Sequence, residues 1–120
     1  MRSILFKAKK LSDGKWVKGS LVKTPFGTFI EWYEDSICNK REVDTDTVCQ
    51  FTGLKDCKGK EIFEHDLIHF VGYKPTAEVF WSEDDYAFMA ASENEPLYLL
   101  SDVLEIGKIE RVCNKFDKEK

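Results

Sequence analysis

The stretch from Val48 to Phe70 constrains the fold of this chain most. Both ends of the stretch are apolar and typical of strands, while its middle collects residues that reverse a chain. Glycine accepts a positive φ without a Cβ clash, so Lys58-Gly59 predicts a tight turn with Gly59 in the left-handed conformation. We therefore interpret Asp56, Glu64 and Asp66 as residues that shape the backbone, and not as ligands of an ion or a substrate.

The run QFTGLKDCKGKEIFEHDLI, residues 50–68, resembles the signature of the YopX family, small proteins encoded by phages and prophages. In that family Gln-aromatic-Thr-Gly-Leu-Lys-Asp leads to Gly-Lys-Glu-Ile-aromatic-Glu-Gly-Asp-Ile. The resemblance extends to ILFKAK near the start, to WVKGSLV at 16–22 and to LEIGKIE at 104–110. His65 stands where the family usually has glycine, which implies a positive φ at His65 if the backbone is left-handed there. The resemblance implies a β-rich fold and a mobile-element origin, but it implies no activity.

The length of 120 residues fits one domain that buries a core without disulfides or metal. We predict a single YopX-like domain over 1–120, which has potential subdomains at 1–50 and 51–110 and a tail at 111–120. The formal net charge of −4 argues against a general phosphate-binding surface, although lysines give the first twenty residues a positive bias.

Alternating apolar and polar residues predict several short strands joined by tight turns. Gly19 inside one of them indicates a bulge or a close approach of another backbone. Residues 34–46 are rich in charge and show no regular spacing of apolar residues, which predicts an irregular loop there. The expected strands are 2–9, 16–23, 28–33, 67–73, 77–81, 86–91 and a closing strand around 104–109, with a short helical turn at 96–100 and a frayed or polar helical tail at 110–120.

These elements predict a mainly β fold of short antiparallel strands and tight turns, with at most one or two short helices. The second half has the strand spacing of a small Src-homology-3-like barrel. Such barrels serve many unrelated functions, so the analogy carries no activity.

The histidines and cysteines do not form a convincing reactive site. His65 is expected in a turn and His69 on a strand, where residues four apart lie about 13 Å from each other, too far to share one zinc ion. Cys57 lies near them in sequence, and a Cys57 nucleophile with a histidine as its base is the one arrangement that would indicate an enzyme. The cysteines lack the close pairs of a zinc site and are expected as free thiols in a reducing cytoplasm: Cys38, Cys49, Cys57 and Cys113.

The acidic residues are expected in solvent, and the aromatic residues divide between core and surface. Consecutive carboxylates at Glu83, Asp84 and Asp85 repel each other and favour an exposed turn. Asp35 and Asp46 are too scattered for a metal site. Aromatic residues beyond the needs of a small core would mark an interface or a base-stacking platform: Trp16, Trp32, Tyr33, Tyr73, Trp81 and Tyr86.

The sequence thus favours a non-enzymatic binding or assembly module that acts through a protein surface in the cytoplasm of a bacterial host cell. Its partner is unidentified, and self-association through an open sheet edge is an option. The alternative is a small β-barrel that binds single-stranded nucleic acid, which is not favoured. We expect no catalytic residue, cofactor or metal site, and no membrane segment.

Overall fold

The computed structural model describes residues 4–71, 76–92 and 97–118. The chain is mainly β, as predicted, and its strands form two antiparallel sheets. It divides after Phe51 into two compact units, each of which is described by itself below. Whether the two fold as one domain stays a prediction. No helix within the described ranges is long and apolar enough to cross a membrane.

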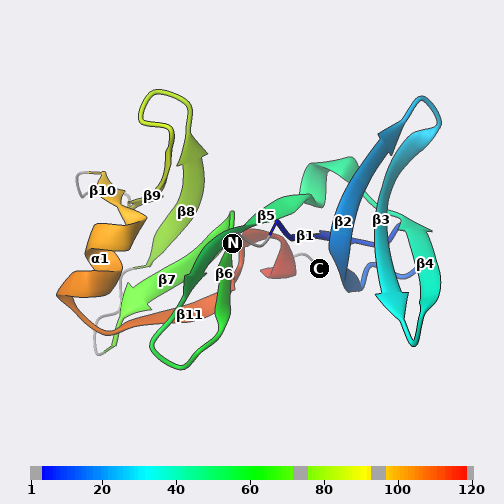
Figure 1. Ribbon diagram of the computed structural model, residues 1–120. Coiled ribbons are helices and arrows are strands. Elements are labelled where there is room, and N and C mark those ends of the chain that lie inside the picture. Colours follow the sequence, from blue (N-terminus) through cyan, green and yellow to red (C-terminus); the bar gives the residue numbers. More distant parts are fainter. Residues whose placement is uncertain (1–3, 72–75, 93–96, 119–120) are drawn as a thin grey trace. The chain divides into compact units, whose positions relative to one another are not determined.

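The first unit is a twisted sheet of consecutive antiparallel strands, drawn from blue to cyan in Figure 1. The strand order is β4-β3-β2-β1-β5, and only the first residues of β5 pair with β1. One face of this sheet packs its core around Ala8, Val17, Ile30 and Val43. The elements are β1 (Phe6–Lys9), β2 (Trp16–Thr24), β3 (Gly27–Glu34), β4 (Ile37–Glu42), the 3₁₀ helix η1 (Thr45–Thr47) and β5 (Cys49–Lys55).

Gly19 on β2 is a point of close backbone approach, as its sequence context predicts. A Cβ at this position would overlap the carbonyl oxygen of Glu31 on β3 and lie 3.1 Å from Cγ2 of Ile30. Gly19 itself faces Phe6 across the β1–β2 ladder. The absence of a side chain therefore allows β3 to pack against β2 at this point.

The prediction of an irregular loop over 34–46 is wrong, because residues 37–42 form strand β4. β4 pairs with β3 from Glu34↔Ile37 to Phe29↔Glu42. The chain reverses through two residues of positive φ, Asp35 (52°) and Ser36 (68°), the geometry of a tight hairpin turn whose twist matches its strands. Most of β4 is exposed, so its sequence lacks the alternation that reveals a half-buried strand.

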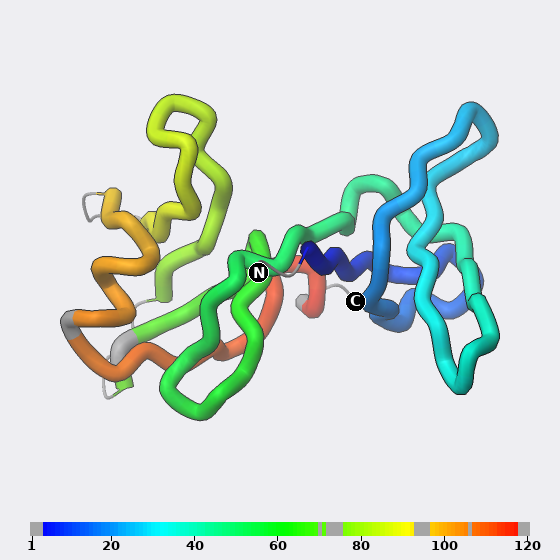
Figure 2. Tube along the Cα trace, viewed as in Figure 1, coloured from blue at the N-terminus to red at the C-terminus, as the bar shows by residue number. Residues whose placement is uncertain are grey.

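The second unit contains a five-stranded antiparallel sheet in the order β10-β9-β8-β7-β11. The second part of β5 forms a hairpin with β6, and this hairpin precedes the five-stranded sheet in the sequence. It can be followed in green along the trace in Figure 2. The elements are β6 (Glu61–Phe63), β7 (Asp66–Phe70), β8 (Ala77–Ser82), β9 (Ala87–Ala91), β10 (Tyr98–Leu99), α1 (Leu100–Ile106), β11 (Ile109–Asn114) and the 3₁₀ helix η2 (Lys115–Lys118).

The core of the second unit lies between β6, the five-stranded sheet and α1. Its buried residues are Ile62, Ile68, Val79, Ala90, Leu100, Val103 and Ile109. β10 and β11 lie at opposite ends of the strand order, and no pairing joins them among the described residues. The sheet is therefore open, and the likeness to a Src-homology-3-like barrel does not extend to a closed barrel.

Three local predictions near the C-terminus are wrong. The expected helical turn at 96–100 has its first residue outside the described ranges, and the residues that precede Leu100 form β10. The expected strand at 104–109 is instead the end of α1, because Leu100 and Val103 lie on one helical face and pack into the core. The tail predicted as a polar helix begins with β11, whose Ile109 is buried.

Candidate functional site

The turn between β5 and β6 is held by the carboxylate of Asp56. Its Oδ1 accepts hydrogen bonds from the backbone N–H groups of Lys58 and Lys60, both at 2.9 Å. Its Oδ2 accepts from the backbone N–H of Arg111 on β11, also at 2.9 Å. Gly59 adopts φ 83° inside this turn, as predicted. Asp56 therefore closes a tight turn and also fastens it to a strand 55 positions away.

The same contacts lower the pKa of Asp56. Burial by itself would raise the pKa of this carboxyl, but the three backbone donors and the nearby charge of Lys60 together bring it below its ordinary value. The ionised form is therefore favoured in the folded protein. All of these partners belong to the chain itself, which fits the interpretation of Asp56 as a residue that shapes the backbone.

This lowered pKa predicts a loss of stability in acid. An acid whose pKa is lower in the folded than in the unfolded chain stabilises the fold fully above its unfolded pKa, and this contribution disappears as the pH falls through the folded pKa. We expect the difference in unfolding free energy between wild type and Asp56→Asn to be constant from neutral pH to about pH 5 and to shrink below about pH 4.

Urea denaturation at a series of pH values measures this difference. Asp84→Asn, in the exposed turn between β8 and β9, is the matched control and should change the unfolding free energy by less than about 0.5 kcal/mol at neutral pH. A wild-type advantage over Asp56→Asn that grows toward pH 3 would contradict the lowered pKa.

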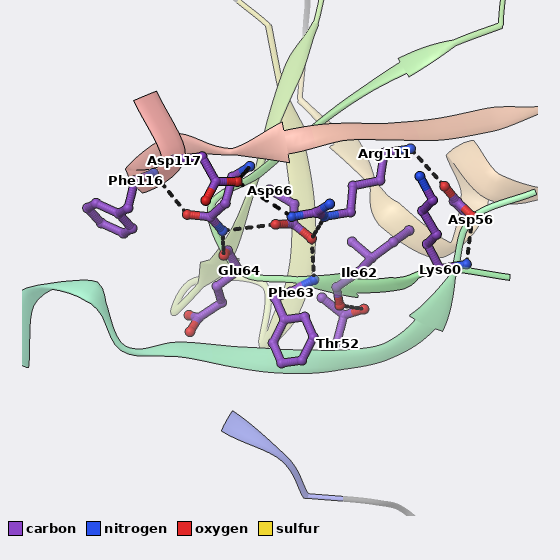
Figure 3. Close-up of polar contacts among 11 residues, drawn as sticks. Thr52, Asp56, Lys60, Ile62, Phe63, Glu64, Asp66, Arg111, Phe116 and Asp117 are labelled. Carbon is purple, nitrogen blue, oxygen red and sulfur yellow. Dashed lines mark hydrogen bonds and ion pairs between the residues drawn. The ribbon is translucent and has the colours of Figure 1, made fainter. Parts of the chain in front are cut away.

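A second carboxylate, Asp66, lies at the centre of a buried polar network shown in Figure 3. Asp66 is fully buried, and its Oδ2 accepts from the backbone N–H of Phe63 at 2.7 Å and from Nε of Arg111 at 3.0 Å. Its Oδ1 accepts from Nδ2 of Asn114, also fully buried, at 2.9 Å. Asn114 also donates to the carbonyl of Glu64 at 3.2 Å. The network joins β6, β7 and β11 and has the character of a structural clamp.

His65 lies in the turn between β6 and β7 with φ 70°, as the resemblance implied. Its backbone N–H donates to the carbonyl of Val79 at 2.7 Å, and its Nδ1 lies 2.8 Å from Oε2 of Glu78. Its ring meets Phe116 edge to face, with centroids 5.4 Å apart. These contacts compensate the left-handed backbone of a non-glycine residue.

His69 lies on β7, as predicted, and takes part in a surface cluster. Its Nε2 lies 3.3 Å from Oε1 of Glu110, and the other oxygen of Glu110 lies 2.6 Å from Nζ of Lys58. The bond to Lys58, and then that to His69, lower the pKa of Glu110, while Glu110 raises the pKa of Lys58. This cluster combines the Lys58–Glu110 ion pair with the His69–Glu110 hydrogen bond at partly exposed positions, where an ion pair adds little to stability.

The structure places Cys57 in the turn next to Lys58. It is exposed, and its backbone N–H donates to the carbonyl of Ile109 at 2.9 Å. Both imidazole rings take carboxylates as partners, Glu78 for His65 and Glu110 for His69. No group of three or more metal-ligating side chains is found in the part of the chain that the structure describes.

The remaining sequence candidates lie in turns and on sheet surfaces. Glu83, Asp84 and Asp85 form the exposed turn between β8 and β9 that the sequence predicts, and the Ser82 hydroxyl bonds Asp85 at 2.9 Å. Asp35 lies in the β3–β4 turn, and Asp46 is exposed in η1. The other cysteines are dispersed: Cys38 is exposed on β4, Cys49 is buried on β5 and Cys113 is half-buried on β11.

The aromatic residues divide between surface and partly covered positions. Tyr33 and Tyr86 are strongly exposed, Trp81 is about one-third exposed, and Trp32 packs against the first core. The ring of Trp16 lies 4.5 Å from Nζ of Lys7 and 5.5 Å from Nζ of Lys9. Tyr73 lies outside the described residues.

Sequence reasoning missed Arg111 and Asn114, which complete the clamp around Asp66, because it assigned residues 110–120 to a tail. It also missed two of the outer strands, β4 and β10. The signal that was available is Arg111, two positions after the apolar Ile109, since a cation near a core requires a carboxylate partner.

A model of one protein family, described as the YopX protein, matches residues 5–118. The chain belongs to the YopX family. No curated protein matches it significantly. The left-handed conformation of His65 in this YopX chain explains the family's usual glycine at that position, since glycine adopts it at the lowest cost. Membership in the YopX family therefore agrees with a central stretch that serves the backbone.

Proposed function

We propose that this YopX chain is a non-enzymatic binding or assembly module that acts through a protein surface. We further propose a phage or prophage origin and a place in the cytoplasm of a bacterial cell. The observation that carries the proposal is a run of three exposed apolar residues, Leu97, Tyr98 and Leu99, at the edge of the second sheet.

The exposed fractions of Leu97, Tyr98 and Leu99 are 56%, 45% and 37%. Tyr98 and Leu99 form β10, which pairs with β9 on one side and is the last strand of its sheet in the described residues. Natural edge strands usually carry charges that discourage pairing with another chain, and these three residues carry none. An apolar edge of this kind favours a protein partner that adds a strand to the sheet.

The polar groups that would otherwise suggest chemistry support the same proposal. Asp56 and Asp66 bind backbone and side-chain donors of the chain itself, and both histidines contact carboxylates. These bonds hold turns and strands in place. The side chains therefore already have a structural role.

Nucleic-acid binding is the second candidate, and one observation favours it. Lys7 and Lys9 bring their ammonium groups to the ring of Trp16, so that positive charge and an aromatic surface occur together on the first sheet. It ranks second because the ring already contacts lysines of its own chain. Binding to single strands that weakens steeply with added salt would support it.

Site-specific photo-crosslinking tests the proposed function. A photoreactive phenylalanine analogue replaces Tyr98 in the cells that naturally carry the gene, and the same analogue replaces Phe26 in a matched control. Phe26 is aromatic and 89% exposed, and it lies in the turn between β2 and β3. We expect discrete protein crosslinks from position 98 and none of comparable yield from position 26. Equal yields at both positions, or none at either, would exclude the edge at β10 as a binding surface.

A further inference from the structure

The two sheets end in outer strands of contrasting character, β4 in the first unit and β10 in the second, both labelled in Figure 1. β4 carries consecutive cations, Lys40 and Arg41, followed by the exposed Glu42, and it also has the exposed apolar side chain of Ile37. β10 is apolar and uncharged. Among the described residues, no further strand pairs with β10 on its outer side, whereas the end of β4 is contacted there, because the Glu42 carbonyl accepts a hydrogen bond from the backbone N–H of Leu11 at 3.1 Å.

The register of β4 shows which of its backbone groups face outward. The two-residue turn makes Glu34↔Ile37 a hydrogen-bonded pair, and such pairs alternate with non-hydrogen-bonded ones along an antiparallel ladder. The backbone N–H and C=O groups of Cys38 and Lys40 therefore point away from β3. The Lys40 carbonyl accepts a hydrogen bond from the exposed Arg41 side chain at 2.9 Å, a contact that an incoming strand could displace.

The two units that carry these edges are opposite in net charge. Residues 1–51 contain nine Lys or Arg and seven Asp or Glu, a net charge of +2, whereas residues 52–120 contain nine and fifteen, a net charge of −6. Near β10, α1 begins directly at Leu100 and presents the exposed carboxylates Asp102 and Glu105. The apolar edge thus has an acidic border.

We propose that the β4 edge of one copy of this chain docks on the β10 edge of a second copy. Ile37 would contact Leu97 and Leu99, while Lys40 and Arg41 would approach Asp102 and Glu105. The chain itself supplies both complementary edges, so a second copy is the occupant that the charges favour. The contact joins two different surfaces and is therefore head-to-tail, which leaves one edge of each kind open at the ends of an assembly. This inference rests on the proposed function and names its partner.

Two charge-reversal variants and their mixture test this interface. The basic-edge variant is Lys40→Glu with Arg41→Glu, and the acidic-edge variant is Asp102→Lys with Glu105→Lys; circular dichroism confirms that each is folded. Light scattering and sedimentation velocity then give the mass of each sample over a range of concentrations. We expect the wild-type mass to rise with concentration and each variant alone to keep the mass of one chain.

The mixture of the two variants gives the sharpest result. Each variant alone carries the same charge on both edges, but every edge of one variant is opposite in charge to the facing edge of the other, so both interfaces can form and the mixture should again rise in mass with concentration, as the wild type does. A chain with all four reversals should assemble again, because its edges are once more complementary. High salt should weaken the wild-type assembly, because the Debye length, over which charges attract each other, falls from about 10 Å at 0.1 M to about 3 Å at 1 M ionic strength.

The control variant Lys15→Glu with Lys23→Glu changes the net charge equally at exposed positions outside β4, and it should assemble like wild type. A wild-type chain that keeps the mass of one chain throughout, or a control that loses assembly to the same extent, would overturn the head-to-tail interface. Crosslinks from Tyr98 to a different protein would then still support the proposed function, so the two failures are distinguishable.

Discussion

Replacement of Asp66 by alanine is expected to lower the free energy of unfolding by about 3–5 kcal/mol, because the buried donors of Phe63 and Asn114 and the partly buried Arg111 cation would all lose their acceptor. In the native protein this carboxylate accepts hydrogen bonds from the backbone N–H of Phe63 and from the side chains of Arg111 and Asn114. Phe63 and Asn114 are buried, so their donors would lose their acceptor without access to water, whereas the Arg111 side chain is partly exposed. Denaturation in guanidinium chloride, followed by circular dichroism, measures the loss.

Two variants make the interpretation of Asp66→Ala specific. Asp66→Asn keeps the shape and one oxygen acceptor but loses the charge, so its loss should be smaller than that of alanine. Asp84→Ala removes a carboxylate from the exposed turn between β8 and β9 and should remain within about 0.5 kcal/mol of wild type. A loss below about 1 kcal/mol for Asp66→Ala would show that the clamp does not hold this unit together.

The second large effect is expected from Gly19→Ala, which should cost about 1–3 kcal/mol through overpacking. The new methyl group would overlap the Glu31 carbonyl oxygen, so β2 and β3 must separate to admit it. Gly59→Ala gives the contrast. Nothing lies within 4 Å of a Cβ at Gly59, so its expected cost of about 1–2 kcal/mol comes from the left-handed backbone alone.

Substitution by asparagine separates the two causes. Asparagine tolerates a left-handed backbone, so Gly59→Asn should recover part of the stability that alanine loses. At Gly19 the larger side chain should cost at least as much as alanine. Equilibrium unfolding of the four variants provides the comparison, and a recovery by asparagine at Gly19 would contradict a steric cause.

The elements that sequence predicted well are those whose local chemistry allows one outcome. Gly59 in a tight turn, Gly19 at a close approach and His65 at positive φ follow from the backbone freedom that glycine has and other residues lack. The half-buried strands β2 and β8 follow from alternation. Each of these signals is contained within a few neighbouring residues.

The elements that sequence did not predict depend on distant partners. β4 is exposed on both faces, so only its ladder with β3 defines it, and its Asp35-Ser36 turn lacks glycine. α1 depends on a core formed by strands far away in sequence, which outweighed the apparent strand pattern before Ile109. The partners of Asp66 likewise lie 45 and 48 positions away, beyond the reach of any local pattern.

The boundary between the two compact units has a consequence for how this protein can evolve. It falls after Phe51, inside β5, and not in a flexible connecting peptide. A gene cut at this point would sever β5, whose first residues pair with β1 and whose remainder pairs with β6, so each product would end or begin inside a paired strand. The halves are therefore poor candidates for exchange as separate cassettes, and we infer that recombination between related genes is tolerated only when it transfers both together.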